Sequence, residues 1–86
     1  MTSSAIHEPD RRPRAVAAAV EGSILRVSIA DGRELLVPVD WFPWLASAGA
    51  ADRSEISIDE GGLSLWWDRL DDGLSVPRLF GLPEWP

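Results

Sequence analysis

The sequence predicts one small α+β domain, in which an antiparallel β-meander or sheet of about five strands carries two short helices in the order ββ-β-α-ββ-α. Three observations support this fold class. Short segments alternate between apolar and polar residues, which is typical of half-buried strands. Asp-Gly and Gly-Gly pairs separate several of these segments, as hairpins require. The chain has 86 residues, enough for one compact core and no more.

The first three strands are expected to form a meander. Asp31-Gly32, between the second and third strands, favours a tight hairpin, because both central positions of such a turn need positive φ. Pro38 has no N–H to donate, so the end of the third strand should lie at a sheet edge. The alternation places these strands at 16–20, 24–30 and 33–39.

A short helix is expected to follow the meander. Asp40 is interpreted as its N-cap, since a carboxylate accepts hydrogen bonds from the free amides of the first turn. Pro43 suits that first turn, where its missing N–H costs nothing. Gly49 should end the helix, and 50–54 should be a polar connection. One apolar face is expected to carry Trp41, Trp44 and Leu45.

The last part of the chain predicts a second hairpin and a second helix. Strands are expected at 55–59 and 63–67, joined by a turn at the Gly-Gly pair, and 68–73 is interpreted as an acidic loop. Ser75 should cap the final helix, which Gly81 ends. The predicted domain therefore spans 14–82, between a disordered arm at 1–13 and a tail at 83–86.

Composition excludes several classes of site. The formal charge is −6, from eight arginines spread along the chain and fourteen acids, and this charge disfavours nucleic-acid binding. Without cysteine there is no thiolate and no Cys-based zinc site, and His7, the one histidine, lies in the predicted arm. We expect no catalytic, cofactor-binding or metal-binding residue. No segment approaches the apolar length of a membrane span or a signal-peptide core, and a cytoplasmic location is the simplest.

The acidic loop allows two interpretations. Asp68, Asp71 and Asp72 could hold a divalent cation or act as a general acid and base. However, their spacing matches no calcium loop, and charge runs of this kind are usually solvated. We therefore favour a solvated turn that precedes the final helix.

Five tryptophans in 86 residues are the most unusual feature of the composition. They could simply fill a small core, or some could anchor a partner protein. Trp66 and Trp67 are neighbours on a predicted strand, so their side chains should point to opposite faces, and only one can enter the core. As partner-binding residues we predict Trp44, Trp66 and Asp71.

Two segments resemble a known family. They are ADGRELLVPVDWFPWL (30–45) and LSLWWDRLDDGLSV (63–76). In this order they resemble the bacterial family catalogued as domain of unknown function 2442. The resemblance implies a small α+β domain whose genes often lie beside a partner gene, in an arrangement like a toxin–antitoxin pair. It implies no catalytic residue, and Trp66, Asp68 and Gly73 depart from the residues usual in the family.

Together these observations favour a protein-interaction module, antitoxin-like or regulatory, that masks another small protein. That partner is expected to be basic and encoded nearby, because an acidic surface suits a basic one. The alternatives are a structural homodimer joined through a sheet edge and a transcription-linked regulator. We do not expect an enzyme.

Overall fold

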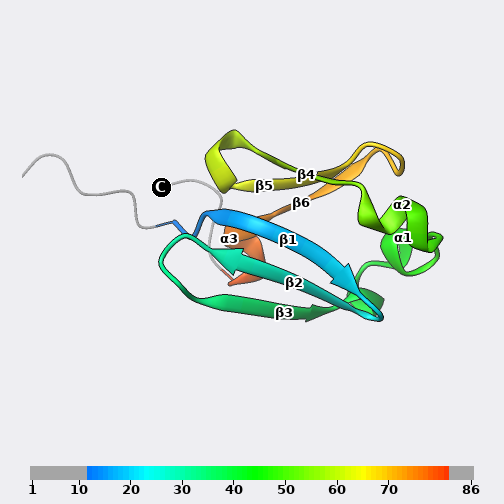
Figure 1. The fold of residues 1–86 in the computed structure, drawn as a ribbon, viewed down its shortest axis with the longest axis horizontal. Coiled ribbons are helices and arrows are strands. Elements are labelled where there is room, and N and C mark those ends of the chain that lie inside the picture. Colours follow the sequence, from blue (N-terminus) through cyan, green and yellow to red (C-terminus); the bar gives the residue numbers. More distant parts are fainter. Residues whose placement is uncertain (1–11, 82–86) are drawn as a thin grey trace, which may run out of the picture.

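The computed structural model describes residues 12–81, which form two three-stranded antiparallel sheets with short helices. The α+β class is therefore confirmed. A single sheet of about five strands is wrong, because six strands divide between sheet A (β1-β2-β3) and sheet B (β4-β5-β6). Figure 1 shows the two sheets one above the other, with α1 and α2 together at one end. Within residues 12–81, no helix is long and apolar enough to cross a membrane.

Sheet A is the predicted meander. Alternation places Leu25, Val27 and Val37 in the core. The hairpin between the second and third strands differs from the expected tight turn. Three residues separate Ile29 from Arg33, whose C=O accepts the Ile29 N–H at 2.8 Å, and of these three only Gly32 has positive φ (97°). The strands are β1 (Ala15–Glu21), β2 (Ile24–Ile29) and β3 (Glu34–Pro38).

Sheet B contains a strand that the sequence did not predict. Residues 72–75 were expected in a loop and a helix cap, but they pair with the preceding strand, and the Val76 N–H donates to the Leu63 C=O at 2.9 Å. Asp and Gly have low strand propensity, so the local sequence does not predict a strand here. The strand forms because its backbone pairs with the preceding strand. The strands are β4 (Ile56–Asp59), β5 (Ser64–Trp67) and β6 (Asp72–Ser75), and η3 (Glu60–Gly62) joins the first two.

The first helix begins later than predicted. Asp40 is not its N-cap, because Asp40 lies inside a 3-10 turn, η2 (Val39–Trp41), and Phe42 precedes α1 (Pro43–Ala46). Pro43 occupies the first turn, as expected. The expected connection at 50–54 is itself a helix, α2 (Ala50–Ser54).

The final helix follows its prediction. In α3 (Val76–Leu79), the Ser75 hydroxyl caps the first turn by accepting the Arg78 N–H at 3.4 Å. Most of the expected arm (1–13), including His7, and the tail (83–86) lie outside the described residues.

One core lies between the sheets, and a set of hydrogen bonds ties the helices to it. Trp67 is fully buried, and its indole N–H donates to the Arg53 C=O at 2.9 Å. The Arg53 guanidinium in turn donates from Nε to the Leu45 C=O (3.1 Å), from Nη1 to the Gly22 C=O (3.3 Å) and from Nη2 to the Ala46 C=O. Arg53 therefore fixes the end of α1 against sheet B and the β1–β2 turn.

Candidate functional site

Trp66 and Trp67 lie on opposite faces of sheet B, as predicted. Trp67 is buried in the core, whereas Trp66 is half-buried on the outer face. Its ring covers Gly73 of the neighbouring strand, since a Cβ added to Gly73 would lie 2.5 Å from Trp66 Cε3. Trp66 therefore packs over β6 and stays partly exposed.

The other two predicted partner-binding residues lie elsewhere. Trp44, on α1, packs edge-on against Trp67 at 5.4 Å and near Phe42 at 6.2 Å, so it contributes to core packing. Asp71 is exposed in the loop between β5 and β6, where its φ is 51°. Trp44 thus lies on the core side of sheet B and Trp66 on its outer side. The structure does not bring the three residues together at one surface.

The acidic loop is a hairpin loop. Asp68 and Asp71 are exposed, and Asp72 is half-buried with its Oδ1 accepting the Gly73 N–H at 2.8 Å. Among residues 12–81, no three His, Cys, Asp or Glu side chains are grouped so that they could hold a metal ion. The loop is linked to α2 through an ion pair between Arg69 and Asp52 at 3.2 Å.

Among the large hydrophobic residues in 12–81, the most exposed is one that the list of predicted partner-binding residues omitted. Trp41 is 68% exposed, since α1 begins only at Pro43 and Trp41 falls in η2 rather than on the inward face of the helix. Asp40 and Pro43 beside it are also exposed. We call Asp40, Trp41 and Pro43 the η2–α1 surface. The preference of proline for the first helical position was the sequence signal that could have placed Trp41 outside the helix.

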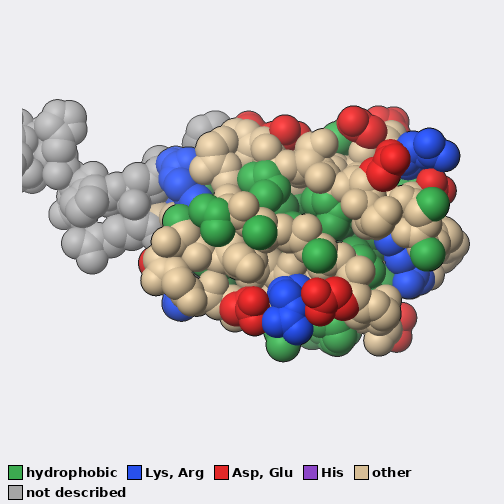
Figure 2. Space-filling view, viewed as in Figure 1, with side chains coloured by type: hydrophobic (Ala, Val, Ile, Leu, Met, Phe, Trp, Pro, Cys, Tyr) green, Lys and Arg blue, Asp and Glu red, His purple; other side chains and the backbone are tan. Residues whose placement is uncertain are grey.

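A second exposed apolar side chain lies on the outer face of sheet A. Leu36 of β3 is 53% exposed and stands opposite Arg26 of β2. Arg26 forms ion pairs with Glu21 (3.0 Å) and Glu34 (2.6 Å), and the hydrogen bond to Glu21 is the main reason why its pKa is raised. In Figure 2 a basic group lies between two acidic groups over β2 and β3, in keeping with these ion pairs.

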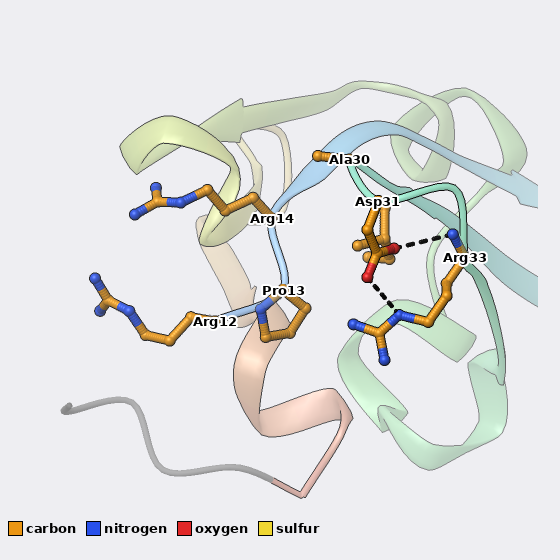
Figure 3. A pocket seen from close by; sticks show the side chains of 7 residues that line it. Arg12, Pro13, Arg14, Ala30, Asp31 and Arg33 are labelled. Carbon is orange, nitrogen blue, oxygen red and sulfur yellow. Dashed lines mark hydrogen bonds and ion pairs between the residues drawn. The ribbon is translucent and has the colours of Figure 1, made fainter. Parts of the chain in front are cut away.

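Tertiary structure gathers three of the scattered arginines around a pocket of about 510 Å³ (Figure 3). Asp31 accepts the N–H of Arg33 at 3.0 Å and its Nε at 2.7 Å, and the backbone bond is the main cause of the lowered pKa of Asp31. The Arg33 guanidinium also lies over the Phe80 ring at 5.0 Å. The lining residues are Arg12, Pro13, Arg14, Ile29, Ala30, Asp31 and Arg33.

These guanidinium groups do not converge. Arg12 and Arg14 extend together to one side, away from Arg33 (Figure 3), and Arg14 donates from Nη1 to the Gly61 C=O at 3.0 Å. An anion-binding pocket needs donors that meet at one point. The pocket therefore has a basic rim without a preorganised anion site.

Comparison with known proteins gives the family and the fold. The chain is similar to a protein of unknown function from Rhodospirillum rubrum whose crystal structure is known, with 27% sequence identity and a TM-score of 0.74, over 81% of this chain and 88% of that one. No curated protein matches. Residues 15–81 match the family described as "Protein of unknown function (DUF2442)". With more than half of its length matched, this chain belongs to the DUF2442 family.

Proposed function

We propose that this protein is a protein-interaction module, an antitoxin-like or regulatory partner of another small protein. The supporting observation is Trp41, which is 68% exposed. Tryptophan buries more apolar area than most side chains, and it is enriched among the residues that dominate binding energy at protein interfaces. A partner that covers Trp41 would remove this apolar surface from water.

Charge indicates the chemistry of the partner. The formal charge is −6, and Arg26 and Arg69 are each bonded to acidic side chains of the same chain. Asp40, immediately beside Trp41, is exposed, and none of the salt bridges between described residues uses it. An apolar anchor with a carboxylate at its side suits a basic surface, and the net charge accelerates association with such a surface.

The experiment is capture of proteins from the native host with the full chain as bait. We expect a small basic protein to be retained by the wild type and lost with Trp41→Ala, while Trp41→Phe keeps part of the binding. Because Trp41 packs against little, its replacement should leave the fold intact, which circular dichroism checks. If Trp41→Ala retains the same protein to the same extent as the wild type, the η2–α1 surface is not the binding surface.

The predicted residues define a second candidate surface, on the outer face of sheet B. Trp66 lies there and Asp71 lies in the adjoining loop between β5 and β6. Trp66→Ala and Asp71→Asn test this surface in the same capture. Loss of the partner with these two variants and not with Trp41→Ala would move the interface to sheet B. Trp44→Ala is a poor probe, because it also removes the edge-on contact with Trp67 and so perturbs folding.

The alternatives predict different measurements. A purely structural homodimer predicts a mass that rises with concentration in light scattering and no other protein retained in the capture. A transcription-linked regulator predicts a gel shift with promoter DNA, which the net negative charge disfavours. The proposal assigns no catalytic, cofactor or metal residue, and it places the protein in the cytoplasm.

A further inference from the structure

Strand β3 is an open edge of sheet A. Figure 1 shows it at the border of the sheet, and in residues 12–81 it pairs with β2 alone. The Ile29 N–H donates to Arg33, and the Val39 N–H donates to Ser23, both at 2.8 Å. In an antiparallel pair, every second residue faces the neighbouring strand. Arg33, Leu35, Val37 and Val39 therefore bond toward β2, and the backbone groups of the residues between them point outward.

The outward-pointing backbone groups of β3 form a short row with a defined order of donors and acceptors. Glu34 and Leu36 each present one N–H and one C=O, whereas Pro38 presents only a C=O because it has no N–H. Leu36 stands at the centre of this row, and its side chain is 53% exposed. The row therefore offers two donors and three acceptors around one apolar side chain.

We propose that a second copy of this chain occupies this edge, with β3 antiparallel to β3 about a two-fold axis that passes beside Leu36. In this register the two Leu36 residues exchange N–H···O=C bonds. Each Glu34 N–H donates to the Pro38 C=O of the other copy, so four bonds form. Because Pro38 has no N–H, each Glu34–Pro38 pair lacks only the second bond, the one that would reach the Glu34 C=O.

The side chains select this register. It places the two exposed leucines opposite each other and sets each Glu34 opposite a proline. A register centred on Glu34 opposes two carboxylates, which destabilises a strand pair. A register that opposes Glu34 to Leu36 also forms four bonds, but it sets each leucine beside a carboxylate. Apolar contact and charge therefore both favour the pairing centred on Leu36.

The assembly closes at two chains. The other outer strand of sheet A, β1, lies against β4 of the same chain, so β3 supplies the open edge on that sheet. The proposed contact uses the same edge of β3 in both chains, so it closes as a dimer instead of growing into a fibre. The short strand and Pro38 further limit pairing with unrelated strands. This inference gives the homodimer a definite edge and symmetry, and it does not rest on the proposed binding at Trp41.

Light scattering on the full chain from about 10 μM to about 1 mM tests the proposal. We expect the mass to rise from 9.4 kDa toward twice that value. Leu36→Arg should raise the dissociation constant at least about tenfold, because it opposes two like charges across the axis. Trp41→Ala should dimerise like the wild type. A mass that stays at one chain, or a Leu36→Arg variant that dimerises as strongly as the wild type, overturns the inference.

Cross-linking tests the register. The chain has no cysteine, so Leu36→Cys carries a single thiol and can form a disulfide only between chains. Residues opposite each other in a hydrogen-bonded antiparallel pair have Cα atoms about 5.5 Å apart, within disulfide reach. Mild oxidation should link Leu36→Cys into dimers and leave Ala19→Cys, an exposed position on β1, unlinked. Equal linking of the two variants, or linking at Leu35→Cys without Leu36→Cys, contradicts the proposed axis.

Discussion

Replacing Arg53 by methionine is expected to destabilise the fold more than any exposed substitution. The side chain donates to the carbonyls of Leu45 (3.1 Å), Gly22 (3.3 Å) and Ala46. Methionine keeps much of the apolar stem and removes every donor. The Arg53 C=O that accepts the Trp67 indole N–H belongs to the backbone, so this bond remains.

The expected magnitude follows from these contacts. A hydrogen bond from a charged donor contributes about 1.5–3 kcal/mol, but the side chain is half-exposed, and water replaces part of what is lost. We therefore expect a loss of about 2–3 kcal/mol for the three bonds together. A domain of this size is stable by roughly 4–13 kcal/mol. Because each kcal/mol lost lowers the Tm of such a domain by about 4–8 °C, the substitution should lower the Tm by at least about 8 °C.

Urea unfolding followed by tryptophan fluorescence measures this loss, because the buried Trp67 reports on the core. Arg53→Lys is the matched control: it keeps the charge but cannot span three carbonyls, so about half of the loss is expected. An Arg53→Met variant within about 0.5 kcal/mol of the wild type would refute the reasoning, since it would mean that water satisfies these carbonyls equally well.

Three further outcomes are expected. Gly73→Ala should cost about 1–3 kcal/mol in urea unfolding, because its Cβ would lie 2.5 Å from Trp66 Cε3; Gly49→Ser, with no atom within 4 Å, should cost less than about 0.5 kcal/mol. The Asp31 carboxylate has a lowered pKa in the folded state, so its stabilising contribution is present at neutral pH and is lost as the pH falls below about 4. The difference between the urea midpoints of wild type and Asp31→Asn should therefore shrink between pH 7 and pH 3; a difference that grows would contradict the sign. Trp41→Ala should change the free energy of unfolding by less than about 0.5 kcal/mol, because Trp41 is 68% exposed, and a larger loss would show that the ring is packed.

Local patterns predicted the elements whose causes are local. The alternation of β2 and the turn residues around it led directly to the meander, because a hairpin joins neighbours in the chain. The Ser75 cap and the first-turn prolines were likewise found, since capping depends on residues one to three positions away. The strand at 72–75 was missed because Asp72 and Gly73 disfavour a strand until β5 supplies hydrogen-bond partners and Trp66 covers the glycine.

For the candidate surfaces, too, some features follow from the local sequence and others from the tertiary structure. The sequence alone determined that Trp66 and Trp67 point apart, because successive side chains of a strand always do. It also determined an acidic chain without thiols. Only the tertiary structure decided that Trp44 packs on Trp67 while Trp41 stays in water, and that β1 lies against β4 while β3 remains open. The physical reason is that exposure depends on which distant segment packs over a residue, and no local pattern specifies that segment.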